Sequence, residues 1–239
     1  MTPSPELSVV IPAYNEAERI GASLRSMRDH LEQHHPQHEV LVVDDGSSDD
    51  TAGLVDRLAV DWPRLRLLRL ETNRGKGRAT RTGVLAAAGD WVLCSDADLS
   101  TPIEELEGLL AAGRARPVVI GSRSLPGARI ERPQPLYRRI MGRAFNRLAR
   151  LAAAGAYADT QCGFKLFRRD AARAIFSRVT VDGFAFDVEV LYLAQRLGYA
   201  VGEVPVAWNN DSDTKVDALR DPARMFADLI AMRLRQRRR

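Results

Sequence analysis

Residues 91–98 read WVLCSDAD, an almost unbroken apolar run that closes on two aspartates separated by one residue. An apolar run of this length predicts a strand that is buried on both faces. Further strands of the same kind are predicted at 7–14 (LSVVIPAY), 39–46 (EVLVVDDG) and 117–123 (PVVIGSR). Helix-like stretches separate these runs. This alternation predicts an α/β fold with a mostly parallel central sheet flanked by helices.

The remaining predicted elements continue the alternation of strands and helices up to Arg123, and their order changes after it. Before Arg123 we expect helices at 16–35, from 49, at 75–88 and from 102, and residues 64–70 alternate. After Arg123 we expect a loop at 124–135, a helix at 137–154, a compact segment at 159–167, helices near 170–178 and 186–197, a strand at 201–208 and a basic amphipathic helix from 222 onward. The length of 239 residues suits one domain, 1–239.

The composition is that of an ordinary globular chain, 45% hydrophobic and 28% charged. No window holds the roughly 18 apolar residues that a membrane span needs. The N-terminus has no basic segment before its apolar run, so we expect no signal peptide. Cys94 and Cys162 are far apart in the sequence, and Cys94 lies in an apolar run, which favours a reduced, cytosolic protein.

The positive charge is concentrated in two places. Residues 123–150 contain eight arginines and a single acid, Glu131, and the C-terminal residues 233–239 read RLRQRRR. On a net charge of only +4, such patches predict an anionic partner, either a phosphate, a lipid headgroup or a nucleic acid.

Polar residues follow four of the predicted strands, and in a parallel sheet those ends meet at one edge, where ligands gather. The ends are Tyr14-Asn15-Glu16, Asp44-Asp45-Gly46-Ser47, Asp96-Ala97-Asp98 and Gly121-Ser122-Arg123. Acids at three neighbouring ends repel one another unless a cation lies between them, and Mg²⁺ or Mn²⁺ prefers carboxylate oxygens together with phosphate. Asp96 and Asp98 are therefore the predicted metal ligands. The alternative is that the pair only caps the helix that follows.

The segment NRGKG (73–77) places two glycines around Lys76 before a predicted helix. It would bring backbone N–H groups and a cation to a phosphate, or else form a glycine-containing turn with an exposed lysine. The Walker A pattern is absent, and Thr80 stands where a dinucleotide fingerprint needs its third glycine. These absences argue against a P-loop NTPase and an NAD enzyme.

With these residues in view, the chain resembles the family 2 glycosyltransferases of the GT-A fold, and within them the dolichyl-phosphate glucose synthases. The matching stretches are SVVIPAYNE, VVDDGSSDDT, NRGKG, DADLS, GSR, DTQCGFKLF and FAFDVEVLYLAQ. They occur in family order over nearly the whole chain, and DTQCGFK followed by FDVE is the most specific. The resemblance implies a nucleotide-sugar half at 1–123 and an acceptor half at 124–239.

The resemblance also implies roles for single residues. The residues implied to bind the nucleotide sugar are Pro12, Tyr14, Glu16, Asp45, Lys76, Asp96, Ala97, Asp98 and Lys215. The residues implied to bind the acceptor phosphate are Arg123, Arg138 and Arg139, and the sugar and acceptor pocket is implied to contain Asp159, Thr160, Gln161 and Lys165. The candidate catalytic residues are Asp187, Asp98 and Arg123. Asp187 stands where many family members have a catalytic carboxylate, with a helix-start residue as the alternative.

The implied activity is transfer of a hexose from a nucleotide diphosphate to a polyprenyl or dolichyl phosphate, with inversion and with Mg²⁺ or Mn²⁺ as cofactor. UDP-glucose is the favoured donor and GDP-mannose the alternative. A phosphate monoester is mostly dianionic at pH 7, so we expect Asp187 to orient the acceptor or an arginine more than to remove a proton. Ser100 stands where mannosyl-lipid relatives have a glutamine that can complete the metal site.

The partner predictions follow from the basic helices at 137–154 and from 222. Paired basic amphipathic helices favour a peripheral position on the cytosolic face of a membrane over a merely solvated charged face. One rival is a transferase with a soluble hydroxyl acceptor. Another is an RNA-binding protein, but few aromatic residues are available for base stacking, so we expect no nucleic-acid partner. The spacing of His30 and His34 could bind a metal, but no acid motif joins them, so we interpret His30, His34, His35 and His38 as surface residues.

Overall fold

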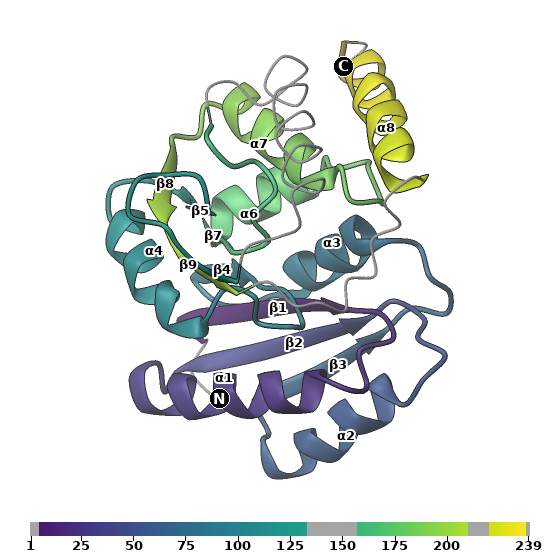
Figure 1. The fold of residues 1–239 in the computed structure, drawn as a ribbon, viewed down its shortest axis with the longest axis vertical. Coiled ribbons are helices and arrows are strands. Elements are labelled where there is room, and N and C mark those ends of the chain that lie inside the picture. The colour runs from purple at the N-terminus through teal and green to yellow at the C-terminus, as the bar shows by residue number, and fades with distance from the viewer. Residues whose placement is uncertain (1–4, 133–156, 210–219, 238–239) are drawn as a thin grey trace.

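A computed structural model describes residues 5–132, 157–209 and 220–237, whose arrangement Figure 1 shows. A seven-stranded sheet forms the centre, in the order β3-β2-β1-β4-β7-β5-β8. Its strands are β1 (Leu7–Ala13), β2 (His38–Asp44), β3 (Leu65–Arg69), β4 (Trp91–Cys94), β5 (Val118–Ser122), β7 (Lys165–Arg168) and β8 (Val201–Pro205). Every pairing is parallel except those of β7, so the predicted mostly parallel sheet is confirmed.

Helices cover both faces of this sheet. They are α1 (Ile20–His34), α2 (Thr51–Asp61), α3 (Lys76–Ala86), the short 3₁₀ helix η1 (Ile103–Glu105), α4 (Leu106–Gly113), α6 (Arg169–Phe176), α7 (Phe186–Arg196) and α8 (Arg220–Arg237). Figure 1 shows α1 and α2 on one side of β1–β3 and α3 on the other. Strand residues alternate between two buried apolar clusters: Val9 packs in the cluster with α1 and α4, and Val10 in the cluster with α3, α6 and α7.

Strand β7 is the main departure from the prediction, because residues 159–167 were expected only as a compact segment. It runs antiparallel between β4 and β5, with Lys165 opposite both Cys94 and Ile120. An antiparallel strand begins where its parallel neighbours end. The residues that precede β7 are therefore delivered to the carboxyl edge of the sheet, beside the ends of β4 and β5.

The single strand predicted at 201–208 is wrong, because the segment divides after Pro205. Proline has no N–H group to continue a ladder, and here it is the last residue of the edge strand β8. The following residues form β9 (Ala207–Asn209), which pairs with β6 (Arg129–Arg132) in a two-stranded sheet. Strand β6 lies within the segment predicted as a loop.

Two other predictions concern helices. The helix expected at 16–35 begins at Ile20, because residues 14–19 form the turn that leaves the sheet edge. The helix expected at 137–154 lies outside the described residues. Among the residues that the structure describes, no helix combines the length and apolarity needed to cross a membrane.

Candidate active site

The polar strand ends identified in the sequence meet at one edge of the sheet, as predicted, because β1, β2, β4 and β5 all point the same way. The backbone turns sharply there. Asn15 has φ of 54°, Gly46 of 71° and Leu99 of 48°, and this left-handed region is costly for a leucine. Backbone strain of this kind is concentrated in functional loops, and here it lies directly after β1, β2 and the Asp96-Ala97-Asp98 segment.

Asp96 is held by Lys76, whose Nζ lies 2.6 Å from the carboxylate oxygen Oδ1. Burial by itself would lower the pKa of Lys76, but the charges of Asp96 and Asp187 outweigh it and raise that pKa. Burial likewise acts to raise the pKa of Asp96, yet Lys76 lowers it below its ordinary value. Both side chains keep some contact with solvent, 22% for Lys76 and 33% for Asp96. The pair is ionised and reachable.

Gly163 makes room for Asp96, and we did not single it out from the sequence. A Cβ atom at position 163 would lie 2.4 Å from the Oδ2 oxygen of Asp96, so the carboxylate occupies space that only glycine leaves free. Gly163 belongs to the DTQCGFK stretch, and that motif is the sequence signal by which it could have been found. The position of this glycine depends on the antiparallel course of β7.

Asp98 is less well compensated than Asp96. Its Oδ2 oxygen is 4.0 Å from a guanidinium nitrogen of Arg19, and its Oδ1 accepts the backbone N–H of Ser100 at 2.9 Å. Burial and the neighbouring charge of Asp96 raise the pKa of Asp98. Ala97, between the two aspartates, is buried. Two hard carboxylate donors with incomplete cationic compensation fit a divalent cation, so the chemistry of these donors agrees with the predicted metal site.

Arg19 is a second site residue that we did not single out, three positions after Glu16. Its Nη2 donates to Glu16 Oε1 at 2.9 Å, and its Nε also contacts that carboxylate. The backbone N–H of Glu16 donates to the Thr51 hydroxyl at 2.8 Å, which ties the turn after β1 to the start of α2. Tyr14 is exposed and Pro12 is half-buried at the same edge. Arg19 therefore links the predicted nucleotide-binding turn to Asp98.

The NRGKG segment does not present the N–H groups of Arg74 and Gly75 to a phosphate. Both donate to the Asp45 carboxylate, at 3.0 and 2.7 Å. Burial raises the pKa of Asp45 above its ordinary value and outweighs these two hydrogen bonds, which by themselves would lower that pKa. Gly75 has φ of 108°, and a Cβ there would lie 2.5 Å from the Asp182 carbonyl oxygen. The phosphate-cradle prediction is therefore wrong for these two N–H groups. The glycine is required by the close approach of the 182 loop.

Lys165 and Asp187 form the most enclosed ion pair of the site. The Lys165 Nζ lies 2.5 Å from Asp187 Oδ1 and also contacts the Cys162 carbonyl oxygen, with side chains only 3% and 6% exposed. Asp187 sits in the first turn of α7, where the helix dipole favours a negative charge. Asp187 was expected to orient the acceptor or an arginine, whereas its partner in the structure is Lys165.

Two side chains, Asp159 and Trp208, hold Arg123 in place. Its Nε and Nη2 donate to the two carboxylate oxygens of Asp159 at 2.6 and 2.9 Å, and its guanidinium lies 5.4 Å from the ring centre of Trp208. Although burial would raise the pKa of Asp159, Arg123 holds it at about 2. Glu203 on β8 in turn accepts the N–H groups of Ala158 and Asp159. Arg123 is thereby fixed beside Asp96, whose pKa it also lowers.

The other predicted site residues divide into those that the structure describes and those that it does not. Thr160 is buried, and the partly buried Gln161 donates its backbone N–H to Asp159 at 3.1 Å. Arg138, Arg139 and Lys215 lie outside the described residues.

Cys94 and Cys162 are both free and buried, as expected for a packed thiol, and burial raises the pKa of Cys94 to about 12.

A model of the family described as glycosyl transferase family 2 matches residues 8–176, which run from within β1 to the end of α6 and include Asp96, Asp98 and Arg123. The chain belongs to glycosyl transferase family 2. The family resemblance and the prediction of a glycosyltransferase are therefore confirmed.

Among curated family 2 proteins, the chain is similar to dolichyl-phosphate beta-glucosyltransferases. It is 39% identical over 233 residues to ALG5C of Trichomonas vaginalis, covering 92% of this chain and 68% of that protein. It is 35% identical over 242 residues to the dolichyl-phosphate beta-glucosyltransferase of Dictyostelium discoideum, covering 96% and 74%. The corresponding human protein is 34% identical over 248 residues, covering 98% and 76%.

Solved structures support the fold. Glucosyl-3-phosphoglycerate synthase from Mycobacterium tuberculosis, crystallised with UDP, superposes with a TM-score of 0.70 at 21% identity, covering 96% of this chain and 80% of that one. Mannosyl-3-phosphoglycerate synthase from Rubrobacter xylanophilus superposes with a TM-score of 0.71 at 23% identity, covering 98% and 75%. The GT-A architecture predicted from the sequence is thus confirmed.

Proposed function

We propose that this family 2 enzyme transfers glucose from UDP-glucose to a polyprenyl or dolichyl phosphate with inversion at the anomeric carbon. The observation that carries the proposal is the Asp96/Asp98 pair, which lies among Lys76, Arg19 and Arg123 at the carboxyl edge of the sheet. Two acids and three cations in this arrangement suit a donor diphosphate and an acceptor phosphate together. Similarity to dolichyl-phosphate beta-glucosyltransferases over more than nine-tenths of the chain supports the choice of sugar and acceptor.

The donor side is built on Asp96 and Asp98, which would hold Mg²⁺ or Mn²⁺. A bound divalent cation would stabilise the negative charge that develops on the departing diphosphate. Lys76 already lies against Asp96 and has solvent access, so an incoming diphosphate competes with Asp96 for its ammonium group. Arg19 supports Asp98 from the turn after β1. Tyr14, Pro12 and Asp45 lie around the ends of β1 and β2, where the nucleoside is placed in this proposal.

The acceptor side is built on Arg123. Asp159 occupies its Nε and Nη2, so the guanidinium is held in one orientation while its charge remains near Asp96. A polyprenyl phosphate has a second pKa of about 6 and is mostly dianionic at pH 7. One of its oxygens attacks the anomeric carbon as the bond to the diphosphate breaks, and UDP leaves with the electron pair of that bond. No proton has to be removed from the nucleophile.

Asp187 acts in this scheme as a positioning residue. Its carboxylate is committed to Lys165, and Lys165 in turn contacts the carbonyl of Cys162, the residue before Gly163. The pair therefore secures the loop that leaves space for the Asp96 carboxylate. A general base would need an available oxygen within hydrogen-bond reach of the acceptor, whereas the buried lysine holds this carboxylate.

Membrane contact is assigned to helix α8. Its inner side is buried through Met225, Leu229 and Met232, while Phe226, Ile230 and Leu234 on another side are 48%, 49% and 58% exposed. These three residues are four positions apart, so they form one stripe, and the exposed Arg224 and Arg235 adjoin it. An exposed apolar stripe with arginines suits the interface of an anionic membrane. Free buried cysteines agree with a peripheral position on the cytosolic face.

The decisive test is transfer of radiolabelled sugar from UDP-glucose, with GDP-mannose in parallel, to a polyprenyl phosphate. The reactions contain Mg²⁺ or Mn²⁺, and matched reactions contain EDTA. We expect organic-extractable label from UDP-glucose that EDTA abolishes. Label from GDP-mannose alone would overturn the choice of sugar. The opposing result is an enzyme that binds a donor, gives no lipid product from either nucleotide sugar and transfers the sugar to a soluble hydroxyl compound. That result would overturn the proposal of a lipid acceptor.

A further inference from the structure

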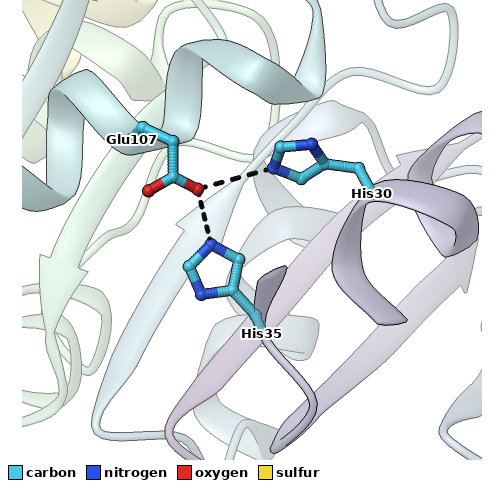
Figure 2. A group of neighbouring side chains, drawn as sticks. All are labelled: His30, His35 and Glu107. Atoms are coloured by element: carbon cyan, nitrogen blue, oxygen red, sulfur yellow. Dashed lines mark hydrogen bonds and ion pairs between the residues drawn. The ribbon is translucent and has the colours of Figure 1, made fainter. Parts of the chain in front are cut away.

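A second group of potential metal ligands lies away from the active site, at the end of α1. Figure 2 shows His30 and His35 facing the carboxylate of Glu107. The Oε1 oxygen of Glu107 is 3.5 Å from Nε2 of His30 and 2.7 Å from Nε2 of His35. The three ligand atoms all lie within 4.8 Å of one another. The expectation that these histidines lack an acidic neighbour is therefore wrong, because α4 supplies one from more than seventy positions along the chain.

This group is remote from Asp96 and Asp98. Helix α1 starts at Ile20, next to the turn that contains Glu16 and Arg19, and its residues rise about 1.5 Å each. His35 is therefore on the order of 20 Å from the nucleotide-binding turn along the helix axis. An ion at the end of α1 would not be a ligand of the donor diphosphate.

The burial and hydrogen bonding of His30 indicate a ligand at this site. Its side chain is only 10% exposed, and among the described residues its Nε2 atom makes no hydrogen bond. The direct contact between His35 and Glu107 satisfies the polar atoms of those two side chains. It leaves the buried His30 nitrogen without a hydrogen bond.

We propose that His30, His35 and Glu107 bind a divalent transition-metal ion, with Zn²⁺ as the favoured ion. Two imidazole nitrogens and one carboxylate oxygen suit zinc better than the hard cations that the Asp96/Asp98 pair prefers. A tetrahedral ion with bonds of about 2.0–2.1 Å separates its ligands by about 3.3 Å. The separations of 3.5 and 2.7 Å lie on either side of that value. Glu107 is 56% exposed, so small side-chain rotations complete the geometry and water reaches the fourth position.

The ion would join two elements that are distant in sequence. His30 belongs to the last turns of α1, His35 is the residue that ends that helix, and Glu107 is in the first turn of α4. The turn after α1 is already held by His38, whose Nδ1 lies 2.8 Å from the His35 carbonyl oxygen. His38 is buried, so its interpretation as a surface residue is also wrong. The metal is thus assigned a structural role, fixing α1 against α4.

The test uses the untagged full chain carrying Asp96→Asn and Asp98→Asn, which removes the active-site carboxylates. The protein is stripped with a chelator, loaded with Zn²⁺ and desalted, and retained zinc is measured by elemental analysis. We expect about one equivalent per chain. His35→Gln and Glu107→Gln should each weaken zinc affinity by at least about 100-fold. His34→Gln, the same change on the neighbouring residue, should retain zinc, because His34 lies outside the ligand group.

Two further measurements separate a metal site from a hydrogen-bonded cluster. Co²⁺ in the same protein should give the visible absorption of a four-coordinate ion, lost in His35→Gln. Zn²⁺ should raise the thermal midpoint of the protein and of its His34→Gln variant, and should leave the midpoint of His35→Gln unchanged. Absence of retained zinc, or equal loss in the His34→Gln and His35→Gln variants, would overturn the proposal.

Discussion

Two lysine–aspartate pairs lie within reach of each other's charge at the carboxyl edge of the sheet, and they differ in exposure. Lys76 and Asp96 are 2.6 Å apart with side chains 22% and 33% exposed. Lys165 and Asp187 are 2.5 Å apart with side chains 3% and 6% exposed. The two pairs therefore have nearly the same length but different energetics. Water screens the first pair, whereas separating the second leaves an uncompensated buried charge.

This difference in exposure indicates which pair can take part in ligand exchange. The ammonium of Lys76 can leave Asp96 for an incoming phosphate at little cost, because solvent and ligand both compensate the aspartate. Lys165 cannot leave Asp187 without a large loss of stability. We therefore assign substrate contact to the first pair and support of the β7 loop to the second. The Arg123–Asp159 pair is intermediate in exposure, with side chains 26% and 6% exposed.

The largest effect is expected from Asp96→Asn, which removes a proposed cation ligand. Transferase activity should fall by at least about 10³-fold, while the free energy of unfolding changes by about 1 kcal/mol or less. Initial rates and urea unfolding measure the two quantities. Asp56→Asn, in the exposed Arg69–Asp56 pair, is the matched control and should leave both unchanged. Retention of more than a tenth of the activity by Asp96→Asn would contradict the assignment.

Asp187→Asn should give the largest loss of stability, about 3–5 kcal/mol in urea unfolding, because Lys165 remains buried without its counter-charge. Activity should fall with it, since the β7 loop is then released.

A double variant separates stability from positioning. Lys165→Met combined with Asp187→Leu removes both charges and should recover most of the lost stability, but not the activity. Full activity in this double variant would show that the pair has no positioning role. A stable Asp187→Asn single variant would show that the pair is not a buried ion pair in solution.

Acid should weaken the Arg123–Asp159 pair in a defined window. The folded-state pKa of Asp159 is depressed from 3.8 to about 2, so the pair stabilises the fold above about pH 4. That contribution, about 2 kcal/mol, is lost as the pH falls from about 4 to about 2. Urea unfolding of the native chain and of Asp159→Asn at pH 5 and pH 3 measures it. The stability difference between them should shrink at pH 3, and a constant difference would contradict the assignment.

The smallest effect is expected from Gly163→Ala. The added Cβ would lie 2.4 Å from Asp96 Oδ2, so the carboxylate has to rotate away from Lys76. Activity should fall by about 10-fold with a stability change below about 1 kcal/mol, because only a flexible side chain moves. Gly108→Ala is the control, since its Cβ would meet Val204 at 3.4 Å. Equal effects of both substitutions would exclude a specific contact with Asp96.

Much of the fold was predictable because parallel strands buried on both faces are local apolar runs. The strands at 7–14, 39–46, 91–98 and 117–123 were found in this way, and their polar ends indicated Asp96 and Asp98. Strand β7 was not found, since DTQCGFKLF has few local strand features and its direction depends on pairing with β4 and β5. The break after Pro205 was missed for a similar reason: the two strands join different sheets.

Local sequence patterns were enough to predict which residues stand at the ends of the parallel strands, because apolar periodicity and chain direction are local properties. They also identified the family through DTQCGFK and its other stretches. The interaction partners, in contrast, depend on the packed fold: Lys76 with Asp96, Lys165 with Asp187, Gly163 against Asp96, and Glu107 beside His30 and His35. Those contacts join residues that are between 20 and more than 70 positions apart, and their formation depends on how strands and helices pack, which no local pattern records.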